Sequence, residues 1–261
     1  MDEQRAFTYL PFHQIAAQDK SRQMGLVTLE TDLTIEDELR FFLGGSAPLS
    51  ASLLHTRIAM DDEVTTDTLT SMEGRFADTL ALYPSNYHFD VIGYGCTSAS
   101  LLIGEDRVQQ LIKSRIDVDH VTTPITAAKR ALDKLGAKNI GYLAPYISEI
   151  SQQMCDNFTS DGYPVLGAAT FGEGRDSVVG CIAPAAILEA LITLAESTPD
   201  IDAIFVSCTS LKCASIIEAA EAELGIPVIS SNSAIAWDMI RLANITVDIA
   251  GKGHLFTSEA L

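Results

Sequence analysis

Residues 90–98 read Asp-Val-Ile-Gly-Tyr-Gly-Cys-Thr-Ser, and residues 202–210 read Asp-Ala-Ile-Phe-Val-Ser-Cys-Thr-Ser. Each stretch has an acidic residue, a short apolar run and a Cys-Thr-Ser, and the two align without a gap. Further matching pairs flank them: residues 24–27 with 140–143 upstream, and residues 121–123 with 229–231 downstream. Such self-similarity indicates an internal repeat. The sequence therefore predicts two similar halves, each with a strand that ends in Cys-Thr-Ser.

Between these motifs, short apolar runs bounded by turn residues alternate with longer stretches of helical period. This alternation is typical of a parallel sheet covered by helices. Strands are expected at residues 25–29, 52–59, 91–95, 120–122, 140–144, 165–169, 203–207 and 228–230. Helices are expected at residues 35–43, 66–82, 106–115, 126–135, 148–161, 184–196, 211–224 and 234–242. The predicted fold class is α/β: two similar domains of parallel sheet flanked by helices, related by a pseudo-twofold duplication.

The repeat also suggests how the domains divide the chain. Residues 1–22 are polar and irregular, with Pro11 interrupting any helix, and are expected to form an N-terminal arm. Residues 23–121 together with 232–256 are expected to form the first α/β domain, and residues 122–231 the second. Because ligands of α/β folds bind at the carboxyl ends of strands, the active site is expected in the cleft between the domains.

Composition excludes several classes of partner. The chain has 17 Lys and Arg against 35 Asp and Glu, a formal net charge of −18, which disfavours binding to nucleic acid or to an anionic membrane. No apolar run is long enough to cross a bilayer, and the N-terminus lacks the basic and apolar regions of a signal peptide. We therefore expect a cytoplasmic protein whose five cysteines are reduced thiols.

The sequence predicts no cofactor. The five histidines are scattered and there is no Cys-x-x-Cys pair, so a metal site is not expected. The nearest approach to a phosphate-binding loop is Gly172-Glu173-Gly174, which lacks the third glycine and the lysine of a P-loop.

Cys96 and Cys208 are the predicted catalytic residues. Each follows a buried strand, and a helix is expected to begin near the following serine. Its dipole and free N–H groups would then lower the thiol pKa. Four neighbouring hydroxyl residues could hold a carboxylate or an oxyanion: Thr97, Ser98, Thr209 and Ser210.

A single cysteine at a strand end is more often an inert packing residue. The duplication of the motif in both halves argues for function here. The remaining cysteines have no counterpart in the repeat and are assigned to packing: Cys155, Cys181 and Cys213.

Two further residues follow strand ends on the same side. Tyr146 comes directly after the strand at residues 140–144, and a core tyrosine is the simpler interpretation. Asp32 lies in the corresponding loop of the first half, where it could instead cap the helix that follows, in competition with Thr34. Trp237 is most simply a packed helix residue.

The motifs resemble a known group of enzymes. Several stretches occur in the order and spacing of the maleate isomerase and arylmalonate decarboxylase branch of the aspartate/glutamate racemase superfamily: residues 95–98, 144–146, 207–210, 225–232 and 236–238. The likeness runs from about residue 24 to residue 243. Residues 29–36 and 96–104 look closest to ectoine-utilisation proteins related to maleate isomerase.

This resemblance implies roles for individual residues. Cys96 would be the thiol that adds to substrate in maleate isomerases and is glycine in arylmalonate decarboxylases, and Cys208 would be the thiol common to the group. Thr97, Ser98, Tyr146, Thr209 and Ser210 fall where these enzymes hold a carboxylate and stabilise an enediolate. The resemblance also implies a homo-oligomer that binds a small carboxylate or amino acid.

One position departs from the group. Maleate isomerases have an asparagine where this chain has Asp32, and a carboxylate there would repel a substrate carboxylate. Asp32 is therefore expected to face an amino group, for which a diaminobutyrate-like amino acid is a candidate.

Three functions remain open at this point. The first is an isomerase, either a racemase or a maleate-type cis–trans isomerase, that works through an enediolate-like intermediate. The second is an arylmalonate-type decarboxylase, which the presence of both cysteines disfavours. The third is a non-catalytic ligand-binding relative that has kept the cleft.

Overall fold

The computed structural model describes residues 8–14, 22–44 and 51–257, and in it the chain forms two parallel sheets with the same strand order. The first sheet, in the order β2-β1-β3-β4, is built from β1 (Arg22–Leu29), β2 (Ala51–Ile58), β3 (Phe89–Gly95) and β4 (Val118–Thr122). The second, in the order β6-β5-β7-β8, is built from β5 (Ile140–Ala144), β6 (Val165–Thr170), β7 (Ala203–Val206) and β8 (Val228–Ser230). The predicted α/β duplication is thus confirmed.

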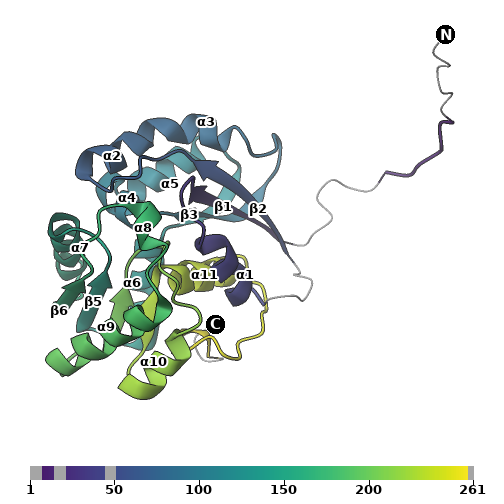
Figure 1. Cartoon of the computed structure of the whole chain (residues 1–261). Helices are drawn as coiled ribbons and strands as arrows, with labels where there is room; N and C mark the ends of the chain where they lie inside the picture. Colours follow the sequence, from purple (N-terminus) through teal and green to yellow (C-terminus); the bar gives the residue numbers. More distant parts are fainter. Residues whose placement is uncertain (1–7, 15–21, 45–50, 258–261) are drawn as a thin grey trace, which may run out of the picture.

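Helices flank both sheets (Figure 1). Those that follow strands of the first half are α1 (Ile35–Phe42), α2 (Thr66–Ser71), the 3-10 turn η1 (Met72–Arg75), α3 (Phe76–Leu80), α4 (Thr97–Ile103), α5 (Glu105–Lys113) and α6 (Pro124–Leu135). Those that follow strands of the second half are α7 (Ser148–Ser160), α8 (Asp176–Val179), α9 (Pro184–Ser197), α10 (Ile217–Leu224), α11 (Ser231–Leu242) and the 3-10 turn η2 (His254–Phe256).

The last helix, α11, crosses from the second half to the first. It follows β8 directly, yet it packs against α1, α6 and β3 (Figure 1). The contact with β3 is close: a Cβ added at Gly93 would lie 2.8 Å from the sulfur of Met239. The absence of a side chain at Gly93 therefore lets α11 lie directly on the first sheet.

The sequence signals that start and stop helices act as expected at several ends. The Thr123 side chain accepts a hydrogen bond from the N–H of Thr126, Pro124 occupies the first turn of α6, and Gly136 ends that helix with φ +69°. Ser230 and Ser233 form a reciprocal capping box at the start of α11. These caps fix where the chain turns from strand to helix at the carboxyl edge of the sheets.

Two predicted helices differ from the structure. The helix expected at residues 66–82 is divided into α2, η1 and α3, with Gly74 in the 3-10 turn. The helix expected at residues 211–224 begins only at Ile217, because the chain after Cys208 makes a series of turns. In contrast, α4 begins directly after Cys96, at Thr97.

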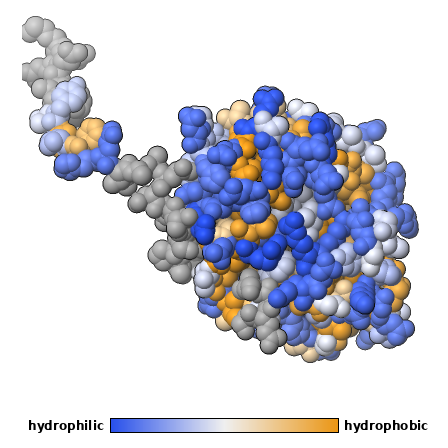
Figure 2. Space-filling model, turned by 180° about the vertical axis from the view of Figure 1, so that it is seen from behind, coloured by the Kyte–Doolittle hydropathy of each residue, from blue (hydrophilic) through white to orange (hydrophobic). Residues whose placement is uncertain are grey.

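The expected arm falls mainly outside the described residues. Of residues 1–22, only 8–14 and Arg22 are described; 8–14 are exposed and have no regular structure, and Arg22 opens β1. The domain limits remain a prediction. Among the described helices, none has the length and apolar content needed to cross a membrane. Hydrophilic side chains cover much of the face in Figure 2, with smaller apolar areas between them.

Candidate active site

Cys96 lies at the junction of β3 and α4. It is the N-cap residue of α4, and its sulfur accepts a hydrogen bond from the N–H of Ala99 at 3.4 Å. The hydroxyl of Ser98 lies 3.8 Å from the same sulfur. The first turn of a helix has N–H groups without intrahelical acceptors, so the N–H groups of Thr97 and Ser98 are available to an anion.

Cys208 follows β7 in a different backbone conformation. Its φ is +91°, a region that side-chain-bearing residues adopt at an energetic cost and mostly at functional sites. No helix begins beside it, since α10 starts at Ile217. The expectation of equivalent helix ends at both cysteines is therefore wrong for the second half: the two motifs share a sequence but differ in local structure.

The two Cys-Thr-Ser segments meet. The Thr209 hydroxyl donates to the carbonyl oxygen of Gly95 at 3.3 Å, which joins the second motif to the residue before Cys96. The Thr97 hydroxyl donates to the Ser231 hydroxyl at 2.8 Å, at the start of α11. The structure thus places the carboxyl ends of both sheets against each other.

Tyr146 lies beside both thiols. Its hydroxyl accepts a hydrogen bond from Ser207 at 3.5 Å and hydrogen-bonds to Cys208, which lowers the Cys208 pKa. Burial raises the pKa of Tyr146 itself well above its ordinary value, and the charges of Cys208 and Cys96 add to this rise. Tyr146 is therefore a neutral hydroxyl donor within electrostatic reach of both cysteines.

Asp32 caps α1, which is one of the two roles considered for it. Its Oδ1 accepts the N–H groups of Thr34 at 2.7 Å and Ile35 at 3.0 Å, so it caps α1. Its Oδ2 is buried and, within the described part of the chain, has no hydrogen-bond partner. Burial raises the Asp32 pKa against the opposing effect of the two N–H donors and of the Thr209 hydroxyl. One oxygen is thus used in the cap of α1, and the other is not.

Asp176, at the start of α8, belongs to the site and was not predicted. Its carboxylate accepts hydrogen bonds from Thr31 at 2.6 Å and from Ser210 at 2.9 Å. Its charge raises the pKa values of Cys96, Cys208 and Asp32. The repeat gave no signal, because Asp176 has no counterpart in the first half. It follows the Gly172–Gly174 stretch, which drew attention only as a phosphate loop.

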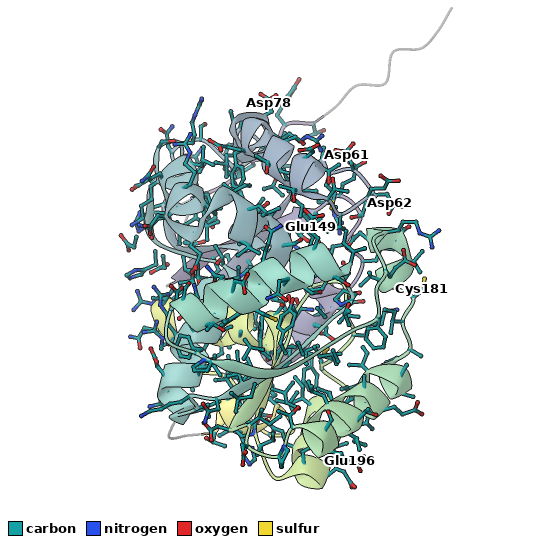
Figure 3. The ribbon with its side chains drawn as sticks, turned by 90° about the vertical axis from the view of Figure 1, so that its left-hand side faces the viewer. Asp61, Asp62, Asp78, Glu149, Cys181 and Glu196 are labelled. Atoms are coloured by element: carbon teal, nitrogen blue, oxygen red, sulfur yellow. The ribbon has the colours of Figure 1, made fainter. Side chains whose placement is uncertain are left out.

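A strap joins the two halves across this site. We use this name for residues 62–64 and 174–177, which follow β2 and β6. Val64 N–H donates to the Gly174 carbonyl at 2.8 Å, and Asp176 N–H donates to the Asp62 carbonyl at 2.9 Å. The Asp62 carboxylate also accepts the Ser177 N–H and hydroxyl, both at 2.9 Å. Figure 3 shows Asp62 beside the short helix that precedes Cys181. The strap therefore fixes the position of Asp176.

The site is closed. Cys96 is 2% exposed and Cys208 is 6% exposed, and the other predicted site residues are also buried: Asp32, Thr97, Ser98, Tyr146, Thr209 and Ser210. Among the described residues, no cluster of His, Cys, Asp and Glu is arranged to hold a metal ion. Both thiols are therefore almost inaccessible to solvent in this structure.

Both thiol pKa values are raised, which corrects the expectation of thiolates stabilised by helix dipoles. Burial raises the Cys96 pKa to about 12, against the opposing N–H of Ala99 and hydroxyl of Ser98. Burial also raises the Cys208 pKa, and Asp176 and Asp32 add to both shifts. Desolvation and two nearby carboxylates outweigh the helix end, so both cysteines are thiols in the closed protein.

The rate at which each cysteine is alkylated should follow its exposure to solvent. At neutral pH, iodoacetamide should modify the exposed Cys181 first, and Cys96 and Cys208 at least about 100-fold more slowly, because only a thiolate that solvent can reach reacts. Peptide mass mapping over time measures each rate. Modification of Cys96 or Cys208 as fast as Cys181 would contradict the closed, protonated state.

A buried carboxyl also supports the second motif. Glu38 of α1 accepts the N–H of Ala214 at 2.8 Å and the side-chain amide of Asn232 at 2.9 Å. The same amide donates to the Thr209 carbonyl at 2.8 Å. Burial raises the Glu38 pKa to about 7. Sequence reasoning missed Glu38, because an acidic residue near a helix start usually faces solvent.

Glu38 should make stability depend on pH. The folded pKa lies above the ordinary value, so its stabilising contribution is complete below pH 4.5 and is lost as pH rises through about 7. Between about pH 5 and pH 8, the wild type should lose about 2 kcal/mol in unfolding free energy relative to Glu38→Gln. Urea titrations of both proteins measure this difference. A pH-independent difference would show that Glu38 ionises normally in the fold.

Comparison with known proteins places this site in a family. The model of the arylmalonate decarboxylase family matches residues 59–256. The chain belongs to the arylmalonate decarboxylase family. Its similarity to maleate isomerases is also extensive: it is 24% identical to the maleate isomerase of Nocardia farcinica over 247 residues, which cover 92% of this chain and 97% of that one.

Solved structures of similar proteins have the same fold as this chain. The maleate isomerase Iso of Pseudomonas putida S16 superposes with a TM-score of 0.81 at 23% identity, covering 91% of this chain and 99% of that chain. A cysteine-to-serine mutant of the Nocardia farcinica maleate cis-trans isomerase, with a covalently bound succinylcysteine intermediate, gives a TM-score of 0.75 at 23% identity, covering 90% and 98%. The resemblance inferred from the motifs is thus confirmed for this branch. The closer likeness to ectoine-utilisation proteins stays a prediction.

Proposed function

We propose that this protein is a cofactor-independent isomerase that acts on a small carboxylate with Cys96 and Cys208. The observation that carries the proposal is the meeting of the two duplicated Cys-Thr-Ser segments, linked by the hydrogen bond from Thr209 to Gly95. The similarity to maleate isomerases supports it. The residues around the thiols supply a hydroxyl donor in Tyr146 and helix N–H groups at the start of α4.

The carboxylate of the substrate would be bound at the start of α4. The N–H groups of Thr97 and Ser98 belong to the first turn of α4 and have no intrahelical acceptor, and the Thr209 hydroxyl lies next to Gly95. In an enediolate-like intermediate, negative charge grows on the carboxylate oxygens, so the same donors bind it more strongly than the substrate. Ser210 already donates to Asp176, so it acts by holding that carboxylate.

Two routes use this arrangement. In cis–trans isomerisation, the Cys96 thiolate adds to one carbon of a double bond, and the electron pair of that double bond moves onto the carboxylate as an enediolate. The carbon–carbon bond, which is now single, rotates, and the thiolate leaves as the double bond re-forms. In racemisation, one thiolate removes the Cα proton and the opposite thiol donates its proton to the other face. Both routes need one thiolate and one polar donor for the intermediate.

Decarboxylation is a second candidate, favoured by the family model itself. The loss of CO2 gives the same kind of enediolate, which one cysteine then protonates. A second thiol, Cys96, has no part in that reaction. A non-catalytic ligand-binding protein would bind the same small molecules without turnover.

Proton NMR in D2O separates these functions. The panel consists of maleate, phenylmalonate, aspartate, 2,4-diaminobutyrate, its acetyl derivatives and a hydantoin. Racemisation requires exchange of the Cα proton, cis–trans isomerisation converts the substrate without that exchange, and decarboxylation releases CO2. We expect isomerisation of one compound, lost on Cys96→Ala and on Cys208→Ala. Full activity in both variants, or CO2 release as the main reaction, would overturn the proposal.

A further inference from the structure

We propose that the substrate carries a cationic amino group, which is bound between the carboxylates of Asp32 and Asp176. This inference rests on the proposed function, because it takes Cys96 and Cys208 as the reacting groups. It adds a second, unpredicted carboxylate to the one that the sequence indicated. It also defines the substrate class as small amino acids rather than simple dicarboxylates.

The first observation is the free oxygen of Asp32. The residue is 1% exposed, its Oδ1 is used in capping α1, and its Oδ2 has no hydrogen-bond partner of good geometry in the described residues. The Thr209 hydroxyl, which is close enough to lower the Asp32 pKa, donates to the Gly95 carbonyl. A buried carboxylate oxygen without a donor is costly, and native proteins rarely keep one without a use. An ammonium group would satisfy both the hydrogen bond and the charge.

The second observation is the fixed position of Asp176. It reaches the site from the second half, where Thr31 and Ser210 donate to its two oxygens and the strap holds its backbone. Its charge acts on Asp32, although the two residues lie in different halves. Two carboxylates brought together in a buried site repel each other, and a bound cation relieves this repulsion.

The third observation is that the charged groups near both thiols are negative. The strongest charge effects on both Cys96 and Cys208 come from Asp176 and Asp32, and both are negative. A dianion such as maleate would bring two more negative charges next to these two carboxylates. An amino acid instead places its ammonium group against the carboxylates and its carboxylate at the N–H groups of α4.

The arrangement also gives the substrate a role in activating the enzyme. An ammonium between Asp32 and Asp176 cancels the two charges that disfavour a thiolate. Without those two contributions the pKa of the neighbouring thiol falls as the substrate binds, while burial, the largest cause of the rise, still acts. The substrate therefore eases formation of the thiolate that the proposed reaction needs.

Calorimetric binding to matched ligands tests the inference without reference to turnover. The pair 2-aminobutyrate and 2-hydroxybutyrate differs only in the amino group, and maleate represents the dianions. The wild type should bind 2-aminobutyrate at least about 30-fold more tightly than either of the others.

Asparagine variants test the two carboxylates separately. Asp32→Asn keeps the oxygen that caps α1, and Asp176→Asn keeps the shape of the side chain and one of its two acceptors. Each should reduce the preference for 2-aminobutyrate by at least about tenfold. Asp61→Asn is the matched control, since Asp61 is exposed and pairs with Arg75. Equal affinity of the wild type for the three ligands would overturn the inference even if no variant folds. An unchanged preference in both folded variants would do the same.

Serine variants of the two cysteines distinguish failure of this inference from failure of the proposed function. Cys96→Ser and Cys208→Ser should bind 2-aminobutyrate with affinity within about threefold of the wild type while losing turnover. If those variants keep turnover, the thiol mechanism fails whatever the ligand preference is. If they lose turnover but the wild type binds maleate best, the inference alone fails.

Discussion

Replacing either Cys96 or Cys208 with serine should lower kcat by at least about 1,000-fold on the compound that the protein converts. Serine has nearly the same shape, so the fold and the hydrogen bonds around the site should persist. A serine hydroxyl is a much weaker acid and nucleophile than a thiol. The exposed Cys181 provides the control: Cys181→Ser should keep full activity.

The two serine variants should also separate the two isomerase routes. In the cis–trans route, Cys208→Ser should accumulate a covalent adduct on Cys96, seen as a mass increase equal to the substrate. The succinylcysteine intermediate in the serine mutant of the Nocardia farcinica enzyme is a precedent in a similar protein. In the racemase route, neither variant should carry an adduct, and each should lose exchange of the Cα proton in one enantiomer. Adducts on Cys208 only would reverse the assigned roles.

Replacing Tyr146 with phenylalanine should lower kcat by about 100-fold, with a small change in KM. The Tyr146 hydroxyl hydrogen-bonds to Cys208 and acts on both thiols, so its donor matters most when charge develops in the transition state. Stability should change little, because the hydrogen bonds lost are the long 3.5 Å bond from Ser207 and the weak one to the Cys208 sulfur. Steady-state kinetics with a thermal unfolding curve measure both quantities.

Tyr83→Phe is the matched control for this variant. Tyr83 is also a buried tyrosine, but it packs against Phe89 at the far end of β3. Its removal should leave kcat within about twofold of the wild type. If Tyr146→Phe keeps kcat as Tyr83→Phe does, the Tyr146 hydroxyl has no part in the reaction. The enediolate must then be stabilised by the N–H groups of α4 alone.

Much of the fold could be predicted because the strands are local patterns. Apolar runs between turn residues locate all eight strands, and the limits of β5 and β8 agree with the expected ones. The repeat identified the two cysteines and the edge of the sheets where they lie. These features depend on short stretches of sequence, and they are easy to recognise because each occurs in both halves.

The remainder depends on contacts between distant residues. Asp176 acts on Asp32 because the strap joins loops that are far apart in the sequence, and no local pattern encodes that contact. The thiol pKa values were predicted in the wrong direction, because the helix end is visible in sequence but the burial and the second carboxylate are not. The turn conformation of Cys208 was missed because its sequence is the same as that around Cys96.

The crossing of α11 has a consequence for synthesis of the protein. During translation, β3 emerges long before α11, the helix that covers it. The first sheet therefore keeps an apolar face uncovered until residues 231–242 have been synthesised. A nascent or truncated chain that lacks residues 231–242 should expose this face to chaperones and proteases.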